Sequence, residues 1–160
     1  PCRAMPDLPI LPDPPYRLQR SLGYHLSLAA RLQERRLDER LRLAGLNRTT
    51  WCILLGVANE NLTQPSDIAS FVGIDRTATS RALRGMESEG FIARLSGESD
   101  KRTRRIVLTE KGRQAVVQAT PYARENGQLL ADLLTSDEAD ELQRLLRVLI
   151  DGTPATLQTL

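Results

Sequence analysis

The sequence predicts a mainly α-helical chain with one small β-hairpin. Apolar residues recur at helical spacing over most of its 160 residues, and Leu and Ala dominate this apolar set. Aromatic residues make up only 4%, which favours aliphatic helix packing over a β-sandwich. A single stretch, residues 92–108, alternates like two short strands around a basic turn.

The N-terminal third divides into an arm and helices. Residues 1–15 hold six of the nine prolines, so we expect an extended arm outside the core. Leucines then recur at helical steps over residues 16–45, which predicts one long helix that ends at Gly45. A short apolar helix over residues 48–58 carries Trp51.

In the middle of the chain the sequence predicts two short helices and a hairpin. The first helix covers residues 65–72 with Thr63 as its N-cap, and Gly73 makes the following turn. Asp75 caps a second helix over residues 76–88. The two strands are expected over residues 92–95 and 105–108.

The C-terminal part predicts two further helices. Thr109 caps a long helix that runs to about residue 134 and that Pro121 bends. Thr135 and Glu138 form a capping box for a last helix. Its apolar stripe needs a surface to cover it, supplied by a partner molecule or by the chain's own long helix. The stripe consists of Leu142, Leu145, Leu146 and Leu149.

Charge is concentrated in one segment. The net charge of the whole chain is +2, but residues 76–113 hold ten Lys/Arg against five Asp/Glu, a local net charge of +5. Such a concentration is typical of proteins that bind a polyanion. The strong bias of the basic residues toward Arg can also reflect genomic base composition.

Several classes of protein are excluded or not supported. The sequence has no run of about eighteen apolar residues, so we expect no membrane-spanning helix. Two cysteines and one histidine provide neither a disulfide framework nor a zinc site, and a reducing cytoplasm is the expected compartment. No nucleophile–base pair or phosphate loop has a suitable spacing, so we expect no enzyme and no cofactor.

Residues 65–82 have the pattern of a helix-turn-helix. Ala69 is small enough for two helices to cross closely, and Gly73 permits a turn with positive φ. The second helix presents side chains that suit a major groove, where Arg reads guanine and hydroxyl groups contact bases or phosphates. The alternative is an ordinary helical hairpin with a solvated polar face. The candidate DNA contacts here are Arg76, Thr77, Thr79, Ser80, Arg81 and Arg84.

The basic hairpin can form a wing beside that motif. Arg102 at its tip suits a narrow minor groove, and Lys101 and Arg104 add positive charge around it. Asp100 fits a supporting role, in which it holds Arg102 or Arg94 through a charge-assisted hydrogen bond. The alternative is a solvated hairpin tip. Together the two motifs predict a winged helix-turn-helix.

Three segments then resemble the signature of MarR-type transcription regulators. They are Gly90-Phe91-Ile92-Ala93-Arg94, Asp100-Lys101-Arg102 and Ile106-Val107-Leu108-Thr109-Glu110-Lys111-Gly112. The resemblance covers roughly residues 16–150. It implies a homodimer that binds a pseudo-palindromic operator in double-stranded DNA, with residues 76–88 as the recognition helix and Arg102 as the wing arginine.

The resemblance also implies a division of the chain. Residues 1–15 would be the proline-rich arm and residues 16–45 the first dimerisation helix. Residues 46–109 would form the winged helix-turn-helix DNA-binding domain, and residues 110–151 the C-terminal dimerisation helices. The expected function is that of a repressor released by a small ligand, often aromatic or carboxylate-bearing in such regulators.

A ligand cleft lined by the first, second and fifth helices would have five candidate contacts. Each has a simpler interpretation, because a charge can be solvated, a histidine can lie at a surface or interface, and a tryptophan can anchor the core. The candidates are Arg17, Arg20, Tyr24, His25 and Trp51.

Two other functions stay open at this point. A redox-sensing regulator would need a reactive cysteine, but Cys2 lies in the arm and Cys52 in an apolar helix. A winged-helix protein–protein adaptor would use the same recognition face against another protein.

Overall fold

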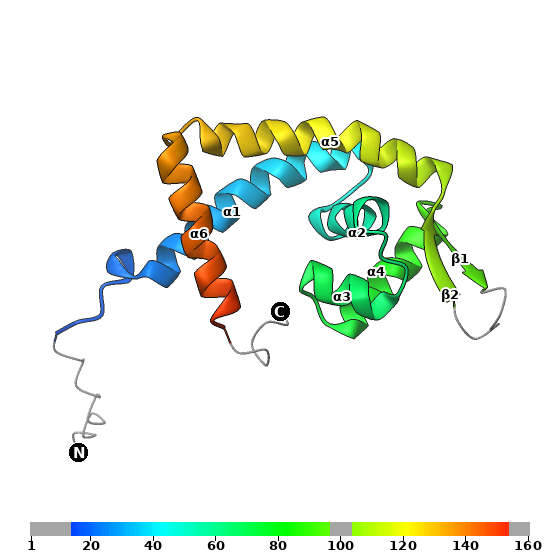
Figure 1. Cartoon of the computed structure of the whole chain (residues 1–160), viewed down its shortest axis with the longest axis horizontal. Helices are drawn as coiled ribbons and strands as arrows, with labels where there is room; N and C mark the ends of the chain where they lie inside the picture. Colours follow the sequence, from blue (N-terminus) through cyan, green and yellow to red (C-terminus); the bar gives the residue numbers. More distant parts are fainter. Residues whose placement is uncertain (1–13, 97–103, 154–160) are drawn as a thin grey trace, which may run out of the picture. The chain divides into compact units, whose positions relative to one another are not determined.

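The computed structural model describes residues 14–96 and 104–153, which form two compact units, 1–32 and 33–160 (Figure 1). In the first unit, a 3-10 turn η1 (Leu18–Arg20) precedes helix α1 (Leu22–Leu41), which ends in the second unit. Ser21 between them has extended backbone dihedrals. The single helix expected from residue 16 is therefore wrong, because this break separates the turn from α1.

The end of α1 is tied to the rest of the second unit. Arg40 donates to a carboxylate oxygen of Glu125 at 2.9 Å, and its guanidinium lies 4.8 Å from the centre of the Tyr122 ring. A 3-10 turn η2 (Arg42–Ala44) follows and ends at Gly45, whose φ is 71°. This left-handed residue confirms the expected stop at Gly45.

Helix α2 (Arg48–Asn59) begins with a capping box. The Asn47 side chain accepts from the backbone N–H of Thr50 at 2.9 Å, and the Thr50 hydroxyl accepts from the backbone N–H of Asn47 at 2.9 Å. The backbone N–H of Arg48 also donates to Asp38 at 3.1 Å. These bonds satisfy donors at the first turn of α2 and link it to α1.

Helices α3 (Pro65–Val72) and α4 (Arg76–Ser88) form the predicted helix-turn-helix (Figure 1). Gly73 has a φ of 75°, and its N–H donates to Ala69 O at 2.9 Å. Asp75 caps α4 by accepting from the N–H of Ala78 at 2.8 Å. The expected cap of α3 is wrong: Gln64 holds the N-cap position without a side-chain bond.

Thr63 has another role, beside the hairpin. Strands β1 (Ile92–Ser96) and β2 (Arg104–Leu108) pair antiparallel, with Ile92 opposite Leu108. The N–H of Ile106 donates away from β1, to the carbonyl of Thr63 at 2.9 Å. The loop between α2 and α3 is thereby attached to the outer edge of β2.

Two helices complete the chain. Helix α5 (Glu110–Ala131) is capped by Thr109, as expected, and continues through Pro121. Helix α6 (Ser136–Asp151) starts with the predicted capping box of Thr135 and Glu138. Within the described ranges, no helix is long and apolar enough to cross a bilayer.

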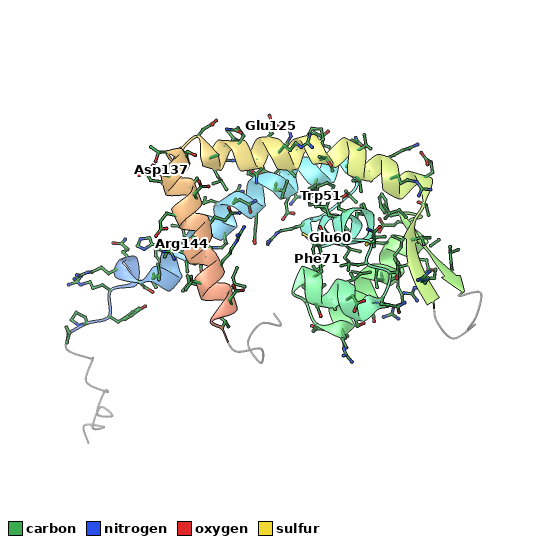
Figure 2. All side chains as sticks on the ribbon, in the orientation of Figure 1. Trp51, Glu60, Phe71, Glu125, Asp137 and Arg144 are labelled. Carbon is green, nitrogen blue, oxygen red and sulfur yellow. The ribbon has the colours of Figure 1, made fainter. Side chains whose placement is uncertain are left out.

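One core supports helices α2 to α5 and the hairpin. Its buried side chains come from each of these elements, including Ala115 and Ala119 of α5, and from the end of α1. Trp51 of α2 is 4% exposed and belongs to this core (Figure 2). The recognition helix and the wing therefore share one rigid support. The largest fully buried side chains are Leu41, Ile53, Leu54, Ile68, Leu83, Met86, Ile92 and Ile106.

The start of α5 packs directly on the turn between α4 and β1. The Thr109 hydroxyl donates to Gly90 O at 2.6 Å and accepts from the N–H of Gly112 at 3.1 Å. Lys111 donates to Glu89 O at 2.6 Å. A Cβ at Gly112 would collide with the carbonyl oxygen of Phe91. We call these contacts the wing junction, and they require glycine at position 112.

Gly112→Ala should destabilise the protein by about 1–3 kcal/mol, because its methyl group must displace backbone rather than a flexible side chain. Urea unfolding at a fixed protein concentration measures this loss. Gly127→Ala in the same helix is the matched control, since nothing lies within 4 Å of its Cβ position. The Gly127→Ala variant should be about 0.5–1 kcal/mol more stable than the wild-type protein, because alanine has a higher helix propensity than glycine. Equal stability of the two variants would contradict the wing junction.

Candidate nucleic-acid interface

The exposed face of α4 carries a stripe of basic and hydroxyl side chains. Its members recur at four-residue steps, which places them on one face of the helix. All are exposed, whereas Leu83 and Met86 on the opposite face are buried. We call this face the arginine stripe, and it consists of Arg76, Thr77, Ser80, Arg81 and Arg84.

The arginine stripe is electrostatically uncompensated. Across residues 14–96 and 104–153, no acidic oxygen lies within 4.0 Å of the guanidinium groups of Arg76, Arg81 or Arg84. The Arg84 Nε donates to the backbone carbonyl of Ser80 at 3.3 Å, which leaves its other N–H groups for a ligand. This face is therefore suited to bind phosphate or base edges.

Thr79 does not belong to this face, and its inclusion among the DNA contacts was wrong. It is 1% exposed, and its hydroxyl donates to the carbonyl of Asp75 at 2.9 Å. Its position four residues before Leu83 places it on the buried side of α4. Thr79 therefore packs in the core, and its polar atom is satisfied within the helix.

Only part of the wing lies within the described residues. Asp100, Lys101 and Arg102 fall outside them, so their expected roles stay predictions. Arg104 begins β2, and its backbone is in register with Ser96.

Arg94 on β1 contacts the recognition helix. Its Nε lies 3.4 Å from a carboxylate oxygen of Glu87 in the last turn of α4, without hydrogen-bond geometry. Arg94 is three-quarters buried at its side chain and Glu87 is more exposed. The pair joins α4 to β1, and the expected support of Arg102 or Arg94 by Asp100 stays a prediction. Sequence gave no signal for the Glu87–Arg94 pair, because the two residues meet only when the turn folds.

Comparisons with known proteins agree with this geometry. Residues 46–103 match the model of the MarR family. The chain is 27% identical over 128 residues to the transcriptional repressor MprA of Escherichia coli strain K12, covering 77% of this chain and 73% of MprA. Over residues 46–103 the chain therefore resembles the MarR family.

Solved structures of MarR-family proteins have the same fold. A mutant MarR of E. coli in complex with operator DNA matches with a TM-score of 0.73 and 25% identity, over 81% of this chain and 93% of that one. The repressor CouR bound to a 23-mer DNA duplex matches with a TM-score of 0.74 and 27% identity, over 82% and 94%. The mainly helical winged helix-turn-helix fold predicted from sequence is thus confirmed.

The expected ligand contacts divide between the two units. Arg17 and Arg20 border a hollow of about 390 Å³ in the first unit, beside Tyr16. Tyr24 and His25 make an edge-to-face ring contact with centroids 5.7 Å apart. Trp51 belongs to the second unit and packs in the core, and its role as a wall of a ligand site stays a prediction.

Cys52 is not an activated thiol. Burial raises the pKa of the Cys52 thiol, and the nearby Arg48 guanidinium lowers this pKa by a smaller amount. A raised pKa leaves less thiolate for reaction with oxidants. Cys2 lies outside the described residues. In the part of the chain that the structure describes, no three His, Cys, Asp or Glu side chains gather to hold a metal ion.

Thr79→Val should separate stability from DNA binding in this chain. The isosteric change removes the bond to Asp75 O and should cost about 0.5–1.5 kcal/mol of unfolding free energy. DNA affinity of the folded variant, measured by fluorescence anisotropy, should change less than about twofold because the side chain is buried. A large loss of affinity at unchanged stability would return Thr79 to the interface.

Proposed function

We propose that this chain is a homodimeric, sequence-specific DNA-binding repressor whose operator affinity a small ligand lowers. The arginine stripe carries the proposal: exposed cations without acidic partners lie on a helix that a buried core holds firmly. The relatives support it, because MprA is named a transcriptional repressor and the matched MarR and CouR structures contain DNA. This role is not enzymatic, and it places the protein in the cytoplasm with the chromosome.

The arrangement suits major-groove recognition. An α-helix fits the major groove of B-DNA, where guanidinium groups pair with guanine and hydroxyl groups contact bases or phosphates. Thr77 and Ser80 supply the hydroxyls, between the three arginines. Lys101, Arg102 and Arg104 at the wing would contact the neighbouring minor groove and backbone, with Arg94 in support.

Replacement of a single stripe arginine tests the interface. Arg81→Ala and Arg84→Ala should each weaken DNA binding about tenfold. If the lost contact is to a phosphate, the slope of the logarithm of the binding constant against the logarithm of the salt concentration should also fall by about 1. Fluorescence anisotropy on a duplex selected from a random library, over a salt series, measures both quantities. Arg124→Ala on exposed α5 is the charge-matched control and should bind like the wild type. If the control and the stripe variants bind equally, the interface lies elsewhere.

Dimerisation follows from the apolar stripe on α6. Leu142, Leu145 and Leu149 are 46%, 45% and 45% exposed, and α6 has no buried residue. Such a patch of leucines on one helix face is unfavourable in water and marks a protein interface. We assign residues 16–45 and 110–151 to dimerisation and residues 46–109 to DNA binding, with residues 1–15 as an arm.

The double variant Leu145→Glu/Leu149→Glu should dissociate the dimer, because it places two carboxylates in the buried interface. Sedimentation equilibrium should then give the mass of one chain, and affinity for a palindromic duplex should fall with it. Arg147→Glu lies on the opposite side of α6 and serves as the control that keeps the dimer. A dimeric double variant would exclude α6 from the interface.

A structure of a similar protein supports the proposal that a ligand releases the protein from DNA. A CouR structure with 25% identity and a TM-score of 0.74 contains p-coumaroyl-CoA. A ligand lowers DNA affinity only if it binds more tightly to a conformation that does not fit the operator. We retain Arg17, Arg20, Tyr24 and His25 as ligand contacts of the first unit, where Arg17 and Arg20 border a hollow.

A further inference from the structure

We propose that the groove between α2, β2 and the start of α5 binds a small carboxylate with an apolar body. The groove has a volume of about 510 Å³, in the range of small-molecule sites. This inference rests on the proposed function, since it places an effector site of the repressor. It differs from the cleft expected from sequence, because the first helix contributes no residue to it.

The floor and walls of the groove are aliphatic. They include four valines, one of which, Val117, is 75% exposed. Leu108 of β2 adds further apolar surface beside the buried Ile106. An apolar chain of about eight to ten carbon atoms would cover this surface and remove it from water. Among the described residues that line the groove none is aromatic.

Among the described residues that line the groove, one is a cation, and its positive charge favours a negatively charged ligand. Arg113 is the charged residue among the lining side chains, and its guanidinium donates to Leu108 O at 3.3 Å. Its Nε lies 3.5 Å from Glu110, in an exposed ion pair that contributes little. A ligand carboxylate can replace Glu110, because guanidinium binds carboxylate through two parallel N–H groups.

The rim of the groove is polar. Asn61 has a φ of 56°, the one positive φ outside glycine among residues 14–96 and 104–153. It directly follows the C-cap of α2, a position where asparagine adopts the left-handed conformation readily. The Asn61 amide and the Thr63 hydroxyl can orient a polar headgroup at the rim.

The groove is connected to the wing. Its wall β2 is one of the two wing strands, and the Thr63 carbonyl at its rim accepts from Ile106 of that strand at 2.9 Å. A ligand that contacts α2, β2 and α5 together therefore favours one position of the wing relative to the core. Binding here would change operator affinity, and operator binding would change ligand affinity by the same factor.

Octanoate is the probe, with octanamide as its uncharged counterpart. Calorimetry with the DNA-free, full-length protein should show binding of octanoate that is about three- to tenfold tighter than that of octanamide. Methyl shifts in NMR spectra should occur at Val57, Val107 and Val116, which line the groove. Saturating octanoate should also change operator affinity of the wild-type protein.

Three variants test the role of Arg113. Arg113→Gln should weaken octanoate binding to the level of octanamide, whereas Arg124→Gln on the same helix should not. Glu110→Gln should tighten octanoate binding, because it removes the competing carboxylate. Equal binding by the Arg113 and Arg124 variants would overturn the site, and binding without any change in operator affinity would overturn its role as an effector site. Operator binding without ligand tests the proposed function separately.

Discussion

The contact between the start of α5 and the turn before β1 holds the interface together. Thr109 caps α5 and donates to the carbonyl of Gly90, so one hydroxyl satisfies groups on both elements. Lys111 lies over the Phe91 ring at 4.4 Å and donates to Glu89 O. Because α4 ends and β1 begins at this turn, the junction determines where the recognition helix, the wing and α5 meet.

Helix α4 has two faces with opposite requirements. Thr79, Leu83 and Met86 are buried and connect the helix to the core, which keeps the other face in place. The Glu87–Arg94 pair adds a link from the last turn of α4 to β1. A helix held at both ends would need little reorganisation on binding DNA. Less binding free energy would then be spent on ordering its side chains and backbone.

Local signals predicted most of the fold, and non-local contacts limited the rest. Gly45, Gly73 and the capping residues Asp75, Thr109 and Thr135 act within one turn, so their roles could be inferred from adjacent residues. The prediction that Thr63 caps α3 was wrong, because the backbone carbonyl of Thr63 instead pairs with β2, which is distant in sequence.

In the candidate site, too, local features were predictable from sequence and non-local contacts were not. The arginines of α4 were predictable from composition, and the four-residue spacing between Thr79 and Leu83 indicates that both lie on the buried face. The Glu87–Arg94 pair and the groove beside Arg113 depend on elements that meet only in three dimensions. Periodicity along one helix contains no information about such contacts.

The first turn of α4 shows why this face is suited to an anion. A helix N-terminus has a partial positive charge, and Arg76 adds a full one there, without any acidic residue in the turn. This arrangement opposes helix stability, and the Asp75 cap offsets it by one hydrogen bond and by its carboxylate charge at the N-cap. A phosphate near this terminus would meet the dipole, free N–H groups and a guanidinium together. The charge that weakens the free helix would therefore strengthen the complex with DNA that we propose.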